Sequence, residues 1–324
     1  MFVPKSALAR FTASTQAIPT RLTTLADFGL ELTPDGRAVD AHGQPYNFKV
    51  HGRDYDANSR RFLALVTVLA SLVKVRLIQD CGLIERPVPD SAPRACSILY
   101  SPDALTTSDP LMVFAVGSGE PLGVVNKASL VNEGLTIGSL LPIVADAQQN
   151  GYKVLILNLY ENALVAGQPW PFIPDDFEMD PIPGSDTPDA HLQSVVEVYL
   201  ATAASRRIHI VTYNDGSRLM LDYLSCLTNA TAQTLKDRVQ AVAMLAPTHH
   251  FDGQYTPSFQ RWVQAHSRAW RLTEIPTSAM GAITTDSSHG CDCQLVGAGD
   301  NTSGDHLLTL AWPEVLQYLR SRAL

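Results

Sequence analysis

Short apolar runs separated by turn residues recur along the chain and predict the strands of a central sheet. The mainly apolar runs at residues 96–100, 111–116, 154–159 and 239–245, of which 111–116 is continuous, are typical of strands in a central sheet. A helical segment within 140–149 lies between two of these runs, and this β-loop-α-β order implies parallel pairing. The pattern therefore predicts an α/β fold in three layers, with a mostly parallel sheet and helices on both faces.

The segment 206–224 is the part of the chain around which the rest is organised. Its β-branched run at 208–211 predicts a strand, and the apolar spacing after Gly216 predicts a helix. Strand, tight turn and helix form the nucleophile elbow of the α/β-hydrolase fold. The elbow needs small residues two positions before and after its tip, and Thr212 and Gly216 meet that need if the tip is Asn214. An amide is not a nucleophile at neutral pH, so this elbow lacks the Ser, Cys or Asp that hydrolysis requires.

Several further elements are predicted from turn residues and local periodicity. They are a hairpin at 28–40, a strand at 45–50, a buried helix at 58–81 capped by Asn58 or Ser59, a proline-rich linker at 87–93, a surface loop at 167–188, helices at 188–204 and 258–269, a strand at 294–298 and a last helix at 313–321.

The predicted organisation is a single α/β-hydrolase-like domain at 27–324 that follows a flexible tail at 1–26. Within the domain, 27–93 form an N-terminal hairpin-and-helix extension, and 94–324 form the hydrolase-like core. The tail contains three basic residues and no acid, which resembles a mitochondrial presequence only weakly. A plain tail is the preferred interpretation.

Composition narrows the classes of partner. Hydrophobic residues make up 45% of the chain and charged residues 17%, which supports a sizeable core. The formal net charge of −8 argues against strong direct binding of nucleic acid. No stretch reaches the roughly 18–20 apolar residues of a membrane span, and residues 62–73 are interpreted as part of a buried helix.

Neither a disulfide framework nor a metal centre is expected. Five cysteines in a chain of 324 residues do not form the pattern of a disulfide-rich fold, so reduced thiols are expected. Cys291 and Cys293 lie near His289, but the spacing is not that of a zinc site. The adjacent His249 and His250, with Asp252 after them, are assigned to a loop without a metal. No cofactor motif is present.

Each slot of a hydrolase triad can be examined in chain order. The glycine-rich Gly117-Ser118-Gly119 is the candidate oxyanion loop. Ala246 stands where the acid would follow its strand, and His306 fills the histidine slot before the last helix. With Asn214 at the tip, the triad retains only its histidine, which favours a hydrolase fold without hydrolase activity.

Two alternatives to a hydrolase fold without activity stay open. An unusual nucleophile is one of them, either Ser118 or Asp215, although Asp215 would place the bulky Tyr213 at the position reserved for a small residue. The other is a small-ligand binding module, in which Asn214 donates and accepts hydrogen bonds next to His306.

With these residues placed, the chain resembles the argonaute-binding-protein-two (Arb-two) domain family, whose animal members are called cotranscriptional regulators. The resemblance runs in order from about Asp27 to Leu319. It is carried by Asp27-Phe-Gly-Leu30, Pro34-Asp-Gly36, Ser101-Pro-Asp-Ala-Leu105, the segment 111–119, Asn132-Glu133, the segment 151–158, His191, the segment 208–216, Val296-Gly-Ala-Gly299 and His306.

The resemblance implies an α/β-hydrolase-like fold in proteins of RNA silencing and chromatin. It implies protein partners, namely argonaute, a histone deacetylase, or chromatin and splicing factors, and a nuclear location with the cytoplasm as a second. Some family members carry His-Ser-Tyr-Gly-Gly at the elbow, whereas this chain has Tyr213-Asn214-Asp215-Gly216 there. It also has Ala246 where an Asp is common and Val116 in place of a polar residue. These departures favour a pseudoenzyme that acts as a scaffold.

Overall fold

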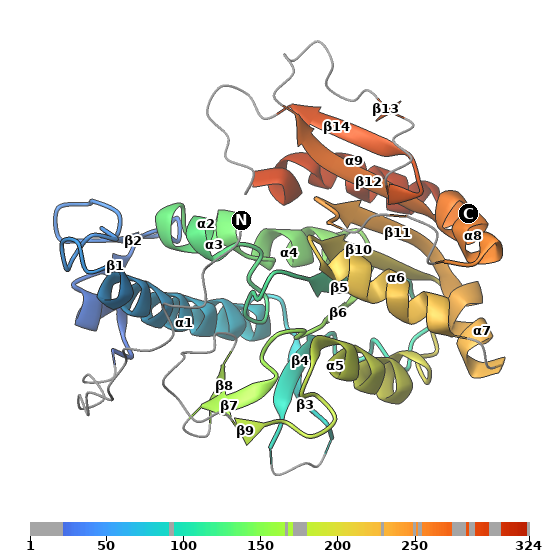
Figure 1. Cartoon of the computed structure of the whole chain (residues 1–324), viewed down its shortest axis with the longest axis horizontal. Coiled ribbons are helices and arrows are strands. Elements are labelled where there is room, and N and C mark those ends of the chain that lie inside the picture. The colour runs from blue at the N-terminus through green and yellow to red at the C-terminus, as the bar shows by residue number, and fades with distance from the viewer. Residues whose placement is uncertain are drawn as a thin grey trace, which may run out of the picture.

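The computed structural model describes residues 22–90, 94–165, 168–170, 180–227, 230–248, 251, 255–273, 283–284, 289–297 and 306–322. Within them, nine strands form one large sheet (Figure 1). In spatial order these are β13 (Ile283–Thr284), β14 (Cys293–Gly297), β12 (Ser267–Thr273), β11 (Val239–Leu245), β10 (Ile208–Tyr213), β5 (Leu111–Val116), β6 (Lys153–Ile156), β4 (Cys96–Tyr100) and β3 (Ile84–Val88).

The strands from β14 to β6 pair in parallel, and β13, β4 and β3 add antiparallel edges. From β5 the chain passes to β6 on one side, and it then returns to β10 and continues outward through β11, β12 and β14. The strand order therefore reverses between β5 and β10. In open α/β sheets, functional sites form at the carboxyl ends of the strands that flank such a point.

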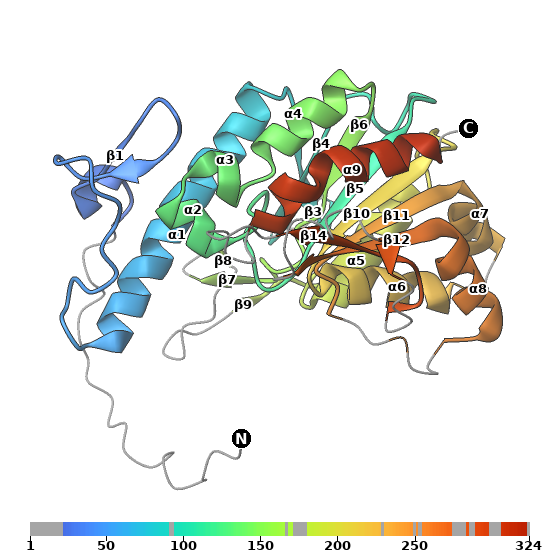
Figure 2. The ribbon, with the colours of Figure 1, turned by 90° about the horizontal axis from the view of Figure 1, so that it is seen from above.

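Helices cover both faces of the sheet (Figure 2). One apolar core joins α1 (Tyr55–Gln79), α2 (Lys127–Asn132), α3 (Leu135–Gly138), α4 (Leu141–Gln149) and α9 (Leu307–Ser321) to one face. A second core joins α5 (Pro188–Val195), the π-helical turn η3 (Val196–Leu200), α6 (Gly216–Cys226), α7 (Ala230–Arg238) and α8 (Pro257–His266) to the other. Along β5, Phe114 lies in the first core and Val113 in the second, as the alternation of a strand requires.

An N-terminal extension packs on the first core. It contains η2 (Leu25–Phe28) and the antiparallel hairpin of β1 (Glu31–Leu32) and β2 (Ala38–Val39). Phe28 and Ala38 are buried in the same cluster as the sheet, and Leu135 N–H donates to the Gly36 carbonyl at 2.9 Å. A small antiparallel sheet of β7 (Ala163–Val165), β8 (Gln168–Trp170) and β9 (Asp180–Pro181) lies beside the main sheet. The expected three-layer α/β-hydrolase-like fold with its hairpin-and-helix extension is therefore confirmed.

Helix α1 is long and apolar enough to cross a membrane by length and composition alone, so the expectation that no stretch reaches that length was too strict. The helix belongs to the folded core, where Leu65, Leu69, Val73 and Leu77 are fully buried. The buried helix of a folded core can be as long and as apolar as a membrane span. The burial of α1 agrees with the predicted buried helix.

Three details predicted for the N-terminal half were wrong: the strand at 45–50, the cap of the long helix and the start of the linker. Residues 45–50 form turns after a single bridge between Val39 and Pro45, because no neighbouring strand continues the ladder. The helix begins at Tyr55, where the Asp54 carboxylate accepts from Ala57 N–H at 2.9 Å, so neither Asn58 nor Ser59 is its cap. The predicted linker begins inside β3, whose outer edge tolerates Pro87 because an edge strand needs fewer backbone donors.

The C-terminal half differs from the predictions at three further places. The helix predicted at 258–269 ends at His266, and residues 267–273 form the parallel strand β12, which has Trp270 fully buried. The last helix begins at Leu307 and passes through Pro313. Part of the predicted loop at 167–188 forms β8 and β9, and residues 171–179 of it lie outside the described residues.

Candidate functional site

Asn214 lies at the tip of the turn between β10 and α6. Its φ is 53°, a left-handed conformation that is uncommon outside glycine and costs energy. Its N–H donates to the Leu245 carbonyl at 3.0 Å, and its own carbonyl accepts from Ser217 N–H at 3.2 Å. A strained strand-to-helix turn of this kind is the geometry of a nucleophile elbow. The structure thus places an amide where a hydrolase carries its nucleophile.

The positions on either side of the tip leave no room for larger side chains. A Cβ atom on Gly216 would lie 2.2 Å from the Ala115 carbonyl oxygen. The Thr212 hydroxyl donates to the Ala243 carbonyl at 3.3 Å and lies 2.8 Å from the hydroxyl of Ser217. Ser217 is fully buried in this network, so it is not available as a substitute nucleophile.

The glycine-rich loop after β5 meets the elbow directly. Gly117 N–H donates to the Tyr213 carbonyl at 2.9 Å. A Cβ atom on Gly117 would lie 2.0 Å from Oδ1 of Asp215, so only glycine lets that carboxylate lie against the loop. The N–H of Ser118 donates to the same Oδ1, and the Ser118 hydroxyl approaches it at 3.4 Å. The candidate oxyanion loop therefore already holds an anion that belongs to the chain itself.

The second oxygen of this carboxylate has its own partner. Tyr160, in the loop after β6, donates its hydroxyl to Oδ2 of Asp215. Burial, and next the hydrogen bond to Asp215, raise the pKa of the Tyr160 phenol above its ordinary value. The phenol therefore keeps its proton at neutral pH and continues to donate. With both oxygens engaged, Asp215 is poorly placed to attack a substrate.

Ala246 and His306 occupy the two other triad positions. Ala246 has φ of 45° at the end of β11, and its methyl group supplies no acid. His306 lies just before α9, and its Nε2 contacts a carboxylate oxygen of Glu133, the residue that caps the end of α2. The histidine thus has an acidic partner from an unexpected element. Glu133 precedes β6 in the chain, so the usual chain order of a triad could not reveal it.

A serine–histidine pair lies on the other face of the sheet, away from His306. His191 is fully buried, with Nδ1 at 2.8 Å from the Ser185 hydroxyl and 3.3 Å from the Cys96 sulfur. Its Nε2 accepts from Asn158 N–H at 3.2 Å, so the ring proton is on Nδ1. Burial lowers the pKa of His191 to about 3. The imidazole therefore donates toward Ser185 instead of accepting its proton, and this pair is structural.

Within the described residues, no group of three His, Cys, Asp or Glu side chains lies close enough together to bind a metal ion. Burial, then the neighbouring Cys293 and Asp292, raise the pKa of Cys291 to about 12, so its thiol stays protonated. His249, His250 and Asp252 lie outside the described residues.

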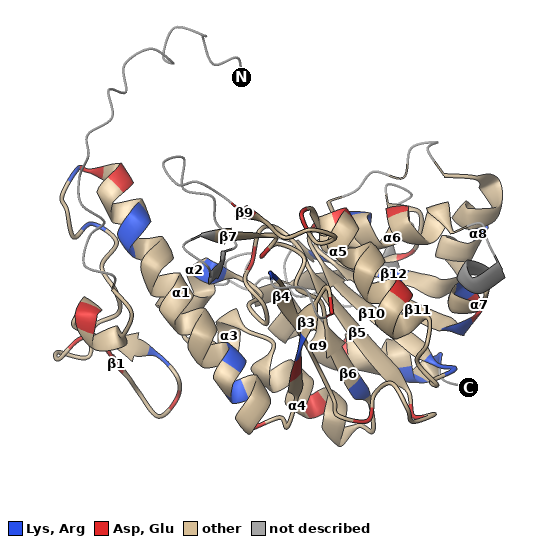
Figure 3. Cartoon of the chain, turned by 90° about the horizontal axis from the view of Figure 1, so that it is seen from below, with Lys and Arg blue, Asp and Glu red and all other residues tan. Residues whose placement is uncertain are grey.

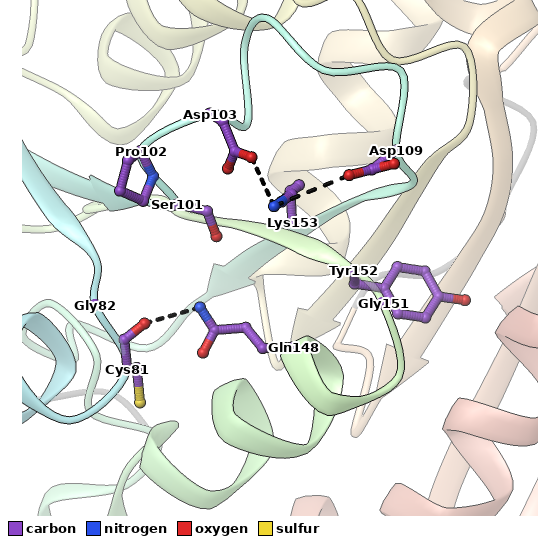
Figure 4. Close-up of a pocket in the computed structure, with 10 residues that line it drawn as sticks. All are labelled: Cys81, Gly82, Ser101, Pro102, Asp103, Asp109, Gln148, Gly151, Tyr152 and Lys153. Carbon is purple, nitrogen blue, oxygen red and sulfur yellow. Dashed lines mark hydrogen bonds and ion pairs between the residues drawn. The ribbon is translucent and has the colours of Figure 1, made fainter.

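A polar hollow of about 290 Å³ lies at the other end of the strands from the elbow and is separate from it (Figure 4). There Lys153, the first residue of β6, contacts Asp103 at 2.7 Å and Asp109 at 3.9 Å. Gln148 donates to the Cys81 carbonyl at 2.9 Å across the same hollow. Because this space lies at the amino ends of β5 and β6, it offers no room to a substrate at Asn214.

The sequence of this chain matches one known domain family. A sequence model described as the Arb2 domain matches residues 22–277, a span that includes the elbow and Glu133 but not His306. The cotranscriptional regulator ARB2A homolog of Xenopus tropicalis is 26% identical over 305 residues, which cover 79% of this chain and 69% of the relative. Human cotranscriptional regulator ARB2A is 24% identical over 302 residues, which cover 79% of this chain and 70% of the relative.

A solved structure of the histone deacetylase Clr3 is similar in fold, with a TM-score of 0.52 and 14% sequence identity. The similarity covers 80% of this chain and 39% of the deacetylase, so this chain spans about two fifths of that protein. At this level of identity, the likeness concerns the fold alone.

Proposed function

This chain belongs to the Arb2 domain family, and we propose that it acts as a non-catalytic scaffold or adaptor in gene silencing or co-transcriptional RNA regulation. The relatives named cotranscriptional regulators support a role coupled to transcription, and hence a nuclear location. The partners proposed are argonaute, a histone deacetylase, or a chromatin or splicing factor. Small-RNA silencing, heterochromatin and splicing are the processes in which such a scaffold would act.

The contact between Asp215 and the N–H of Ser118 carries the non-catalytic part of this proposal. An oxyanion hole stabilises negative charge only if its N–H groups are free to receive it. Here a carboxylate occupies one of them, so a substrate oxyanion would meet a like charge instead of a donor. The nearby Asn214 cannot begin the reaction either.

The pair of His306 and Glu133 supports a structural use of the remaining histidine. It links the start of α9 to the end of α2, two helices that pack on the same face of the sheet. Without a nucleophile to deprotonate, the pair has a role in holding these helix ends together. A scaffold needs a rigid surface, and such links between elements supply rigidity.

Affinity purification of the full tagged chain from its own cells tests the scaffold role. The expected result is enrichment of an argonaute, a histone deacetylase or a splicing factor over a tag-only control. Recovery of none of these protein classes by the folded chain would contradict the proposal.

A further inference from the structure

A surface of basic and apolar side chains lies at the start of α1, at the end of the molecule farthest from α7 and α8 (Figures 1 and 2). Turns at residues 48–53 lead from the hairpin into the helix. We define the α1 surface by the exposed side chains of this loop and of the first helical turns. They are the basic and apolar side chains Lys49, Val50, His51, Arg53, Tyr55 and Arg60, with the exposed acids Asp54 and Asp56 between them.

The apolar members of the α1 surface are unusually open to solvent. Tyr55 is 71% exposed and Val50 is 48% exposed. Large apolar side chains at such exposure, gathered in one place and rimmed by polar groups, mark an interaction site more often than isolated ones do. Figure 3 shows Lys and Arg on the same loop and on the first turns of α1.

Buried contacts hold this loop in place. Asn58 is 2% exposed, accepts from His51 N–H at 2.8 Å and donates to the Gly52 carbonyl at 3.4 Å. The Phe48 ring centroid lies 5.8 Å from that of Tyr55. The same ring packs edge-on against Phe62 of α1, with 6.0 Å between the centroids. The exposed side chains therefore project from a pre-organised base, which lowers the entropic cost of binding a partner.

The cations of the α1 surface are available for binding. Within the part of the chain that the structure describes, no side-chain hydrogen bond or ion pair engages Lys49, Arg53 or Arg60. Lys74, farther along the same helix, is by contrast paired with Glu85 at 2.5 Å. Unpaired cations beside apolar groups are thus a local feature of a chain whose net charge is −8.

We propose that the α1 surface binds a short acidic peptide segment of a partner protein, one that also carries an apolar side chain. Carboxylates would pair with Lys49, Arg53 and Arg60, and the apolar side chain would pack on Tyr55. A short peptide fits better than nucleic acid, because the cations occupy one small surface and a longer phosphate chain would run onto a protein whose net charge is −8. This inference goes beyond the proposed scaffold function and does not depend on which pathway the chain serves.

A fluorescent peptide of alternating Glu and Leu residues tests the inference on the full chain by fluorescence anisotropy. We expect saturable binding that the double charge reversal Lys49→Glu with Arg53→Glu weakens by about tenfold or more. Tyr55→Ala should weaken it several-fold, because the apolar anchor is lost. The matched control is Arg206→Glu with Arg261→Glu, two exposed cations elsewhere, and it should bind as the wild type does. Equal melting temperatures of all variants would show that the fold is kept.

Absence of peptide binding, or equal weakening by the control variant, would overturn the inference. Binding of an oligouridine through the same residues, without peptide binding, would overturn it as well. Recovery of silencing or splicing proteins by the Lys49→Glu, Arg53→Glu variant would leave the scaffold proposal standing. The two proposals can therefore fail separately.

Discussion

The carboxylate of Asp215 accepts a hydrogen bond from the backbone N–H of Ser118, across the point where the strand order of the sheet reverses. The contact joins the end of β5 to the end of β10, and Tyr160 adds a third element by donating to the same carboxylate. The contact lies at the candidate oxyanion loop, the loop in which we propose that a hydrolase would bind the charge on its substrate.

Removing this charge should destabilise the fold. In Asp215→Asn, the amide oxygen can still accept one of the two hydrogen bonds, but the NH₂ group faces the other donor. We expect a loss of about 1–3 kcal/mol in the free energy of unfolding, measured by urea denaturation. The exposed Asp186→Asn is the control and should change it by less than about 0.5 kcal/mol. Equal effects of the two substitutions would show that the Asp215 contacts contribute nothing.

Gly216→Ala should be among the most damaging substitutions in the chain. The added methyl group would meet the Ala115 carbonyl at 2.2 Å, and backbone atoms cannot move aside cheaply at the centre of a sheet. A loss of about 3 kcal/mol or more is expected in the same denaturation assay. Ser217→Ala removes a hydroxyl from the adjacent position without adding bulk and should cost less. A Gly216→Ala protein of wild-type stability would contradict the tight elbow.

Acid should weaken the fold through two buried histidines. Burial lowers the pKa of His191 to about 3, and burial followed by the charge of Arg207 lowers that of His209 to about 4. The unfolded chain takes up these protons near pH 6.5, whereas the folded chain resists them. Stability is therefore complete above about pH 6.5 and falls as the pH drops toward 4, by up to about 1.4 kcal/mol per pH unit for each histidine.

Denaturation at a series of pH values measures this slope. A His209→Gln variant should show a shallower decline than the wild type, because one of the two proton uptakes is removed. The exposed His42→Gln should leave the slope unchanged. A wild-type stability that stays constant from pH 7 to pH 4.5 would contradict the assignment of neutral, buried imidazoles.

The link between His306 and Glu133 should be measurable but small. Both side chains are partly exposed, at 20% and 34%, so solvent screens their attraction. A double-mutant cycle of His306→Ala and Glu133→Ala should give a coupling free energy of about 0.5–1 kcal/mol. The coupling should shrink as salt is added. Strict additivity of the two single substitutions would mean that the pair does not hold α9 to α2.

The sequence predicted best those elements whose pattern is local. The strands at Cys96–Tyr100, Leu111–Val116 and Val239–Leu245 have the predicted bounds, because a short and mainly apolar run is typical of a buried strand. Strand β12 was missed, since Arg268 and Arg271 interrupt its apolar pattern and no Gly or Pro separates it from α8. Burial of that segment depends on α9, which lies far away in the sequence.

The candidate site likewise contains features that are set locally and features that depend on distant parts of the chain. The tip of the elbow could be located from the sequence, because the spacing of Thr212 and Gly216 around it is a local steric requirement. The partners of Asp215 and His306 could not, because Tyr160 and Glu133 come from elements that only folding brings close. Glu133 belongs to the family resemblance, but its role as the partner of the histidine follows from the structure alone.

Incubation of the purified full chain with short-chain esters and with a fluorophosphonate probe tests whether the elbow is catalytic. We expect no hydrolysis above the buffer rate and no covalent adduct by mass spectrometry, with the His306→Ala variant indistinguishable from the wild type. Ester hydrolysis that His306→Ala abolishes, or an adduct on Ser118 or Asp215, would contradict a non-catalytic elbow.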